Sequence, residues 1–484
     1  MAADELVVDV QPFGPDPADL QQLSEGLLER PALKDVLART RHQLLSLELL
    51  ETDRKVARPR APDRFRATIY DYTNDRTVFA DGSVRDPRKL QVRESGLQPL
   101  PTREEFDRAA AVIGRDKELG PALREGRLRT YPPMPPLVAD DEAGGGHRRV
   151  VAVGLLPADG KRGHEIAGVD IARRSVVRLP GGAPSTALAT EQACGRPDAR
   201  QATSGRGYVP GQAWVTVSKG GTVLWRFLAV RPAASSGTNG SGVELRYVDY
   251  KGKRVLHRAH VPLLNVRYDN DACGPYLDWQ KEEGMIQAQG VDVAPGFRLC
   301  PSPAQTALDT GDDAGSFLGV AIYVQGQEVV LVSEMEAGWY RYVSEWRLHA
   351  NGNIQPRFGF GAVSHTCVCN VHHHHAYWRL DFDIRTAGDN IVREFNDPPL
   401  LGKSKWHTIR FENHRPRNPA RKRRWRVQHR DTGEAYEIIP GSEDGVATHR
   451  PTGPSRRATY GSCATAARRS TTASLPRGLR TRPT

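Results

Sequence analysis

Residues 212–441 constrain the fold more than any other part of the 484-residue chain, because they read almost entirely as β-strand. Runs such as GTVLWRFLAVRP, FLGVAIYVQGQEVVLVSEM and RRWRVQHRDTGEAYEIIPG are rich in β-branched and aromatic residues. Turn pairs such as KG, QG, NG and TG separate these runs at short intervals. We therefore expect residues 212–445 to form an antiparallel β-sandwich.

The first hundred residues have a different pattern, in which helix comes before strand. Leu20, Leu23 and Leu27 follow at three- and four-residue steps, and Pro31 is typical of the first position of a second helix. The runs LLSLELLE and RFRATIYDY then change to a period of two, which favours strands. This pattern predicts a small α+β domain over residues 1–100.

A second unit of the same kind follows. Thr102 and Glu105 have the spacing of a capping box that opens a helix, and the strand-like runs RRVVAVGLLP and HEIAGVDIARRSVVRL come after it. We expect a second α+β domain over residues 101–183 and a Ser-, Thr-, Ala- and Gly-rich linker over residues 184–211. The predicted fold class is therefore small N-terminal α+β domains followed by a mainly-β antiparallel super-sandwich.

The net charge of +11 suggests a nucleic-acid partner, but the distribution of that charge along the chain argues against one. Residues 446–484 hold eight arginines and no acidic residue, so the first 445 residues carry 60 basic and 57 acidic side chains. We expect no nucleic-acid partner and interpret the basic run RPRNPARKRR as a solvated loop. No apolar run approaches the length of a membrane span and the N-terminus lacks a secretory signal, so we expect no membrane partner and a cytoplasmic location.

Four consecutive histidines, residues 372–375, form the clearest metal-binding motif. On a β-strand, His372 and His374 share one face, while His373 and His375 point to the other. Two imidazoles at this spacing can bind one metal ion. The alternative is an exposed polyhistidine turn with adventitious metal affinity.

The cysteines leave a similar choice open. Six cysteines are too few for a disulfide scaffold in a chain of this length. Cys367 and Cys369 alternate just ahead of the histidines, which makes them possible metal ligands. Two small buried thiols are the simpler interpretation.

Several of these segments resemble the copper-containing, topaquinone-dependent primary amine oxidases. LWRFLAVRP followed by GVELRYVDYKGKRVLHRAHVPLLNVRY is similar to that family's entry into its large β-sandwich. The HxH motif followed by RLD is similar to its copper motif, and the YRYVSEWRLHANGN segment looks like its quinone-tyrosine hairpin. The two N-terminal units resemble the cystatin-like domains that precede the sandwich in this family.

The resemblance assigns roles to individual residues. It implies that His372 and His374 bind copper and that Tyr340 is the precursor of topaquinone. Tyr342 falls on the second tyrosine of the family's signature and is expected to contact the cofactor. Trp339 and Arg341 stand where the family has an asparagine and an acid, and a precursor ring needs space to rotate during its oxidation.

The implied reaction converts a primary amine and dioxygen into an aldehyde, ammonia and hydrogen peroxide. Glu282 lies at the position of the family's general base, the alternative being an exposed loop carboxylate. The family is homodimeric, which implies a homodimer here. The other function that the sequence leaves open is a catalytically inactive amine-oxidase-like sandwich that binds a ligand or partner.

The last 39 residues do not continue the family's pattern. Its third copper histidine follows a strand that has no counterpart after residue 445. With permitted codons, a shifted reading frame across residues 455–473 can read FPASDVWVLRYRGTEIDDG, in which DVWVLRY is similar to that strand. We therefore interpret residues 446–484 as a disordered, out-of-frame tail and expect the β-sandwich to be truncated.

Overall fold

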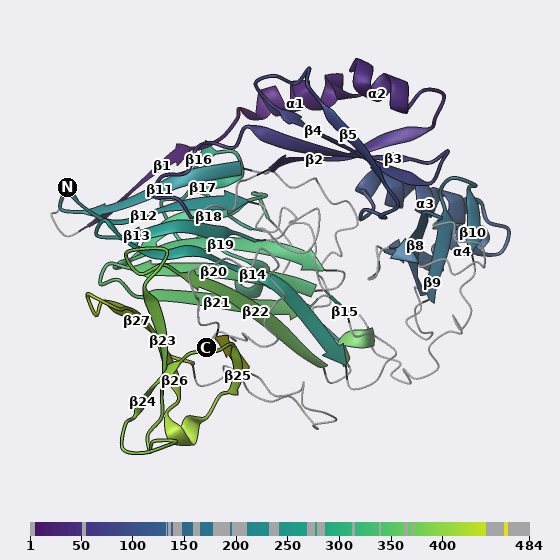
Figure 1. Ribbon diagram of the computed structural model, residues 1–484. Helices are drawn as coiled ribbons and strands as arrows, with labels where there is room; N and C mark the ends of the chain where they lie inside the picture. The colour runs from purple at the N-terminus through teal and green to yellow at the C-terminus, as the bar shows by residue number, and fades with distance from the viewer. Residues whose placement is uncertain are drawn as a thin grey trace.

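The alternating runs of the sequence fold into two large β-sheets that face each other, as Figure 1 shows. The computed structural model describes residues 5–50, 55–131, 133, 137–138, 148–157, 165–177, 194–195, 211–231, 242–268, 276–277, 286–311, 315–337, 340–362, 366–369, 372–441 and 459–462. This arrangement confirms the predicted mainly-β sandwich.

The first large sheet has the strand order β1-β11-β12-β13-β14-β15, with β22 paired to β14. Its strands are Leu6–Pro12 (β1), Gly211–Lys219 (β11), Thr222–Arg231 (β12), Glu244–Tyr250 (β13), Lys253–Tyr268 (β14), Tyr276–Leu277 (β15) and His372–Phe382 (β22). All its described pairs are antiparallel. β1 was not among the predicted strands, and it pairs with β11 from more than two hundred residues away.

The second large sheet has the order β16-β17-β18-β19-β20-β21. Its strands are Val291–Ala294 (β16), Phe297–Leu299 (β17), Val320–Gln325 (β18), Glu328–Ala337 (β19), Tyr340–His349 (β20) and Ile354–Ala362 (β21). The short helix α5 (Ala307–Thr310) precedes β18. Its described pairs are antiparallel except the parallel pair of β17 with β18.

The main core lies between these two sheets. Trp346 of β20 and Trp378 of β22 meet edge to face, with ring centroids 5.0 Å apart. Both side chains are at most 2 % exposed. Burying a large apolar side chain contributes roughly 1.5–3 kcal/mol, so this contact between opposite sheets stabilises their stacking.

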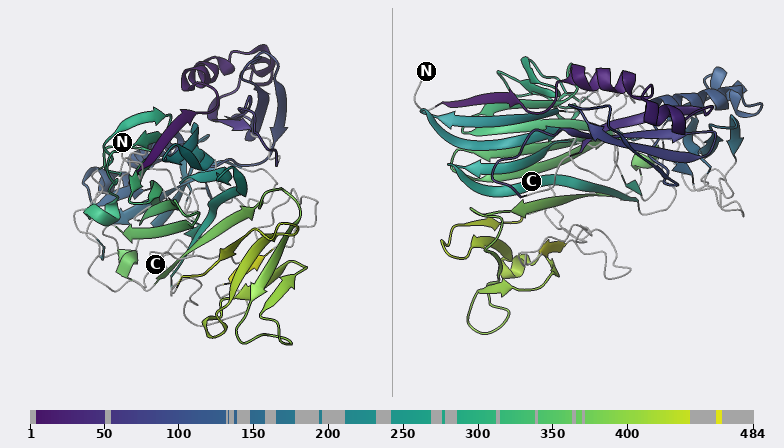
Figure 2. Two further views of the ribbon diagram at one scale, coloured as in Figure 1. Left: turned by 90° about the vertical axis from the view of Figure 1, so that its left-hand side faces the viewer. Right: turned by 45° about the horizontal axis from the view of Figure 1, so that its top comes forward.

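The first small unit packs two helices on a four-stranded sheet with the order β2-β3-β4-β5. Its elements are α1 (Pro17–Leu27), α2 (Pro31–Val36), β2 (His42–Leu50), β3 (Arg64–Asp71), β4 (Arg76–Ser83) and β5 (Gln91–Ser95). Leu23 and Leu27 are buried as the helical period predicts, and α2 begins at Pro31. Figure 2 shows this unit beside the sandwich from two further directions.

The second small unit is also built from helices and a sheet, with α3 packed on a sheet of order β10-β9-β8-β6. Its elements are α3 (Arg103–Arg115), α4 (Leu119–Arg124), β6 (Leu128–Tyr131), β7 (Leu137–Val138), β8 (Val150–Pro157), β9 (Glu165–Asp170) and β10 (Ser175–Val177). The predicted capping box is confirmed, since Thr102 accepts from the Glu105 amide and Glu105 accepts from the Thr102 amide. The described helices are all too short or too polar to serve as a bilayer span.

A partly buried ion cluster joins the first small unit to the sandwich. Lys55 donates to Asp381 Oδ1 at 2.7 Å and to Asp383 Oδ1 at 2.6 Å. Burial raises the pKa of Asp383, and the ammonium group of Lys55 only partly opposes that effect. The contact therefore attaches the segment after β2 to the C-terminal end of β22.

A smaller sheet of order β24-β23-β26-β27 follows β22, and β25 pairs with β28. The strands are Asn390–Phe395 (β23), Trp406–Ile409 (β24), Asn413–Pro416 (β25), Arg424–His429 (β26), Ala435–Ile438 (β27) and Thr459–Ser462 (β28). The basic run includes the short helix η3 (Pro419–Arg421) and the start of β26, so part of it is strand rather than loop. In β26 the guanidinium of Arg424 stacks 3.7 Å from the ring centroid of Phe395, which orders that charge on the sheet.

Candidate metal and cofactor site

The site is built on the hairpin of β20 and β21. The predicted HANGN turn is confirmed: the His349 amide donates to the Asn353 carbonyl, and Gly352 has a φ of 98°. Glycine adopts that left-handed conformation without a Cβ clash. The register of the hairpin places Tyr342 directly opposite Phe360, and both face the core.

The four histidines lie in β22, on the opposite sheet, as the strand interpretation predicts. The ring of half-buried His374 reaches across the core to β20. There the hydroxyl of Tyr342 and Nδ1 of His374 form a hydrogen bond of 2.7 Å. This contact engages Nδ1, so a metal bound by the same imidazole would use Nε2.

Aromatic rings enclose the imidazole of His374. Phe360 stacks on it with centroids 3.6 Å apart, and Tyr340 approaches edge-on at 4.5 Å. Tyr340 is 2 % exposed and Tyr342 is 1 % exposed. The sequence motifs did not identify Phe360, although counting outward from the HANGN turn pairs it with Tyr342.

Arg341 does not crowd the ring of Tyr340, because neighbouring side chains on a strand point to opposite faces. Its guanidinium lies 3.9 Å from the carboxylate of Glu336 and donates to the Tyr340 carbonyl at 3.0 Å. Arg341 is 1 % exposed, so it is buried behind the sheet rather than beside the site. Arg341 therefore does not obstruct rotation of the Tyr340 ring. Trp339, the other predicted obstacle, lies outside the described residues.

Two of the predicted site side chains also fall outside the description. Glu282, the predicted base, is among the residues that the structure does not describe. His372 is placed only by its backbone, which pairs with Tyr268 of β14. The described site therefore consists of Tyr340, Tyr342 and His374, together with Phe360.

The chemical type of the described donor group suits copper. Imidazole is a ligand that suits copper, and a tyrosine hydroxyl on Nδ1 is the sort of outer partner that orients a metal-binding histidine. His374 supplies one such nitrogen, and the backbone of His372 lies two residues before it in β22. Among the described side chains there is no group of three or more histidines, cysteines, aspartates or glutamates that could hold a metal.

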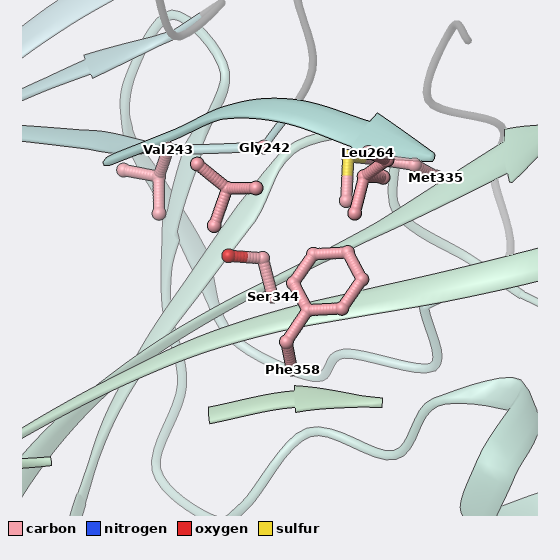
Figure 3. A pocket seen from close by; sticks show the side chains of 7 residues that line it. Gly242, Val243, Leu264, Met335, Ser344 and Phe358 are labelled. Atoms are coloured by element: carbon pink, nitrogen blue, oxygen red, sulfur yellow. The ribbon is translucent and has the colours of Figure 1, made fainter. Parts of the chain in front are cut away.

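A small apolar pocket lies between the two sheets, as Figure 3 shows. Phe358 lines this pocket and also contacts the candidate site, since its ring centroid is 5.7 Å from that of Tyr342. The lining residues are Gly242, Val243, Val261, Leu264, Met335, Ser344 and Phe358. Only Ser344 brings a side-chain oxygen or nitrogen to this lining, so the surroundings of Tyr342 on this side are apolar.

The cysteine prediction is partly wrong. Cys369 forms a disulfide with Cys194, with Cα atoms 5.0 Å apart. Cys369 is therefore neither a free thiol nor a metal ligand in this structure. The two residues are 175 positions apart, so no local spacing in the sequence could reveal the pair.

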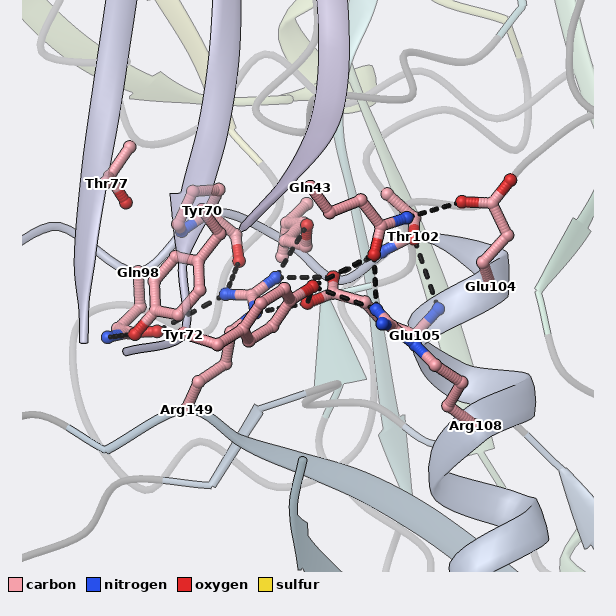
Figure 4. A network of polar contacts seen from close by, with 12 residues as sticks. Gln43, Tyr70, Tyr72, Thr77, Gln98, Thr102, Glu104, Glu105, Arg108 and Arg149 are labelled. Carbon is pink, nitrogen blue, oxygen red and sulfur yellow. Dashed lines mark hydrogen bonds and ion pairs between the residues drawn. The ribbon is translucent and has the colours of Figure 1, made fainter. Parts of the chain in front are cut away.

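A second buried polar cluster lies where the two small units meet, and Figure 4 shows it. Arg149 donates to Glu105 at 2.6 and 2.7 Å through two nitrogens, and both side chains are fully buried. Tyr72 donates to the same carboxylate at 2.7 Å, and Tyr70 lies under the guanidinium. Burial opposes ionisation of Glu105, but the bonds and charge of Arg149 outweigh it, so the pKa of Glu105 lies below its ordinary value.

Comparison with known proteins finds likeness in structure rather than in sequence. No protein-family model matches the chain, and no curated protein matches it in sequence. The copper-containing benzylamine oxidase of Hansenula polymorpha superimposes with a TM-score of 0.55 and 12 % identity, over 91 % of this chain and 83 % of that one. The amine oxidase of Aspergillus nidulans gives 0.51 and 14 %, over 91 % and 76 %.

A third solved structure extends the same likeness. The lysyl oxidase of Pichia pastoris gives a TM-score of 0.50 with 11 % identity, over 93 % of this chain and 80 % of that one. The similarity therefore includes the small units as well as the sandwich. At these identities it establishes architecture, and we conclude that this chain shares the fold of the amine oxidases.

Proposed function

We propose that this chain is a copper- and quinone-dependent primary-amine oxidase, which converts a primary amine and dioxygen into an aldehyde, ammonia and hydrogen peroxide. One observation carries the proposal: Tyr340 and Tyr342 meet His374 inside a sandwich that has the amine oxidase fold. In this proposal Tyr340 is the precursor of topaquinone, and His372 and His374 bind copper.

Each residue has a physical task. Copper, when bound, supplies one-electron oxidation chemistry at dioxygen and at the neighbouring phenol. Tyr342 orients the ring of His374 through Nδ1, so that a bound metal would be held through Nε2. The burial of Tyr340 keeps water from its ring. Glu282 is the proposed general base that takes the α-proton of the amine.

The decisive experiment is reconstitution of copper-free protein with Cu(II) in air. We expect a visible quinone band that shifts on addition of phenylhydrazine. Tyr340→Phe should bind copper and stay colourless, whereas Tyr323→Phe, a buried tyrosine in β18 of the same sheet, should behave as wild type. Copper binding by the wild type without colour would remove the oxidase proposal.

The second candidate function is a catalytically inactive amine-oxidase-like protein that retains a metal or ligand. The observation that favours it is the packing of Phe360 on His374 at 3.6 Å, with Tyr340 edge-on to the same imidazole. Rings packed this closely resist the rotation that quinone formation requires. In the reconstitution experiment this function corresponds to bound copper and an unmodified Tyr340, which peptide mass spectrometry would reveal.

We also propose that the chain forms a homodimer, as the resemblance implies. Sedimentation equilibrium of the purified protein tests this directly. A single species at the monomer mass of 53.5 kDa across the accessible concentration range would exclude the dimer.

A further inference from the structure

The disulfide between Cys194 and Cys369 lies at the entrance to the strand that carries the candidate ligands. Cys369 ends the short helix η2 (Thr366–Cys369), which connects β21 to β22. His374 follows five residues later, and Phe360, which stacks on it, precedes Cys369 by nine. The covalent bond therefore holds the connection between the two strands whose rings meet at the site.

The disulfide is also accessible to small reductants and oxidants. Cys194 is exposed and Cys369 is half-buried, while Val368 of η2 packs against the main hydrophobic cluster. A disulfide with one exposed sulfur-bearing residue can exchange with solution thiols, unlike one enclosed in a core. The bond can therefore open while the packing of the sandwich persists.

We propose that Cys194–Cys369 is a redox clamp on the metal site: the closed disulfide holds the start of β22 so that His374 stays between Tyr342 and Phe360, and its reduction weakens metal binding. The clamp depends on the proposed function only because it acts on the copper that this function requires. It adds a control that neither the histidine motif nor the fold likeness implies.

Closing the clamp needs an oxidant, and hydrogen peroxide, a product of the proposed reaction, is of the right class. The Cys194 thiolate takes one oxygen from the peroxide to form a sulfenic acid and release hydroxide. The Cys369 thiol then displaces that oxygen as water and forms the S–S bond. In total two thiols lose two electrons and two protons, and one peroxide becomes two waters.

The test compares full-length wild type with two variants. In Cys194→Ser the disulfide cannot form, whereas Cys367→Ser replaces the nearby cysteine and keeps the Cys194–Cys369 disulfide. Peptide mapping after alkylation should find Cys194 joined to Cys369 in wild type and in Cys367→Ser. Hydrogen exchange of the peptide spanning residues 366–376 should be faster in Cys194→Ser. Competition with a chromophoric chelator should show Cu(II) bound about tenfold more weakly by that variant alone.

Each failure has a separate meaning. Free Cys194 and Cys369 in air-oxidised wild type, or unchanged hydrogen exchange in Cys194→Ser, would overturn the clamp. Equal copper affinity in wild type and Cys194→Ser would overturn its control of the metal while the proposed function stands. Absence of copper binding in every variant, with altered exchange, would remove the proposed function and the metal control together and leave a structural tether.

Discussion

Two of the buried polar clusters in the described part of the molecule are organised in opposite ways. At the junction of the small units, Arg149 and Glu105 form a bidentate salt bridge, and both side chains are fully buried. In the sandwich, the half-buried His374 meets a tyrosine hydroxyl and packs against aromatic rings. The first cluster is a set of opposite charges, and the second is an imidazole that packs against aromatic rings and bonds to a tyrosine hydroxyl.

This difference separates a structural cluster from a functional one. A buried ion pair satisfies its own members, and removal of one partner leaves an uncompensated charge, which is costly. An imidazole whose Nδ1 is engaged by a hydroxyl would bind a metal through its other ring nitrogen. Mutations at the first cluster should therefore act on stability, and mutations at the second on ligand binding.

The largest expected effect is at the ion pair. Arg149→Met should lower the free energy of unfolding by about 3–5 kcal/mol, because Glu105 would stay buried without its partner. Urea denaturation followed by circular dichroism measures this. Arg127→Met, which removes an exposed ion pair with Glu125, is the matched control and should cost less than about 1 kcal/mol. Equal losses in the two variants would contradict the comparison.

The next effect is at the histidine strand. His374→Ala should weaken Cu(II) binding by roughly a hundredfold, or about 2.7 kcal/mol, because it removes a ligand. His375→Ala, whose side chain we predict on the opposite face, should change affinity by less than about threefold. Chelator competition measures both. If the two substitutions weaken binding equally, the run acts as an adventitious polyhistidine site.

A smaller effect is expected at the hydrogen bond to the imidazole. Tyr342→Phe should weaken Cu(II) binding by about tenfold, because the ring of His374 loses the partner that orients it. Stability should change by only about 1 kcal/mol, since one buried hydroxyl is removed and the ring stays. Tyr323→Phe serves as the control. A loss of stability without a change in affinity would make Tyr342 a purely structural residue.

The smallest effect concerns pH. The pKa of Glu105 is lowered in the folded state, so its contribution to stability is complete above the ordinary value of 4.5 and is lost as pH falls through the folded pKa. The stability difference between wild type and Glu105→Gln should therefore shrink as acid is added below that value. Urea denaturation at a series of pH values measures it, with Glu125→Gln as the exposed control. A difference that stays constant with pH would rule out this linkage.

Local rules predicted the parts of the fold that depend on near neighbours. The capping box of Thr102 and Glu105, the helix opened by Pro31 and the hairpin around Gly352 all follow from hydrogen bonds or backbone angles within a few residues. The strand assignment of the histidine run also follows from its local pattern. The roles of Glu282 and His372 and the boundaries of the small domains stay predictions.

The sequence by itself thus determined many of the strands and helices, though not β1, and that tyrosines and histidines recur within one stretch, because side-chain alternation and capping act over a few residues. Only the tertiary structure decided that β1 joins β11, that Cys369 bonds to Cys194 and that the hydroxyl of Tyr342 meets Nδ1 of His374. Those contacts depend on how two sheets stack and in which register, and stacking is set by the packing of the whole core rather than by any local pattern.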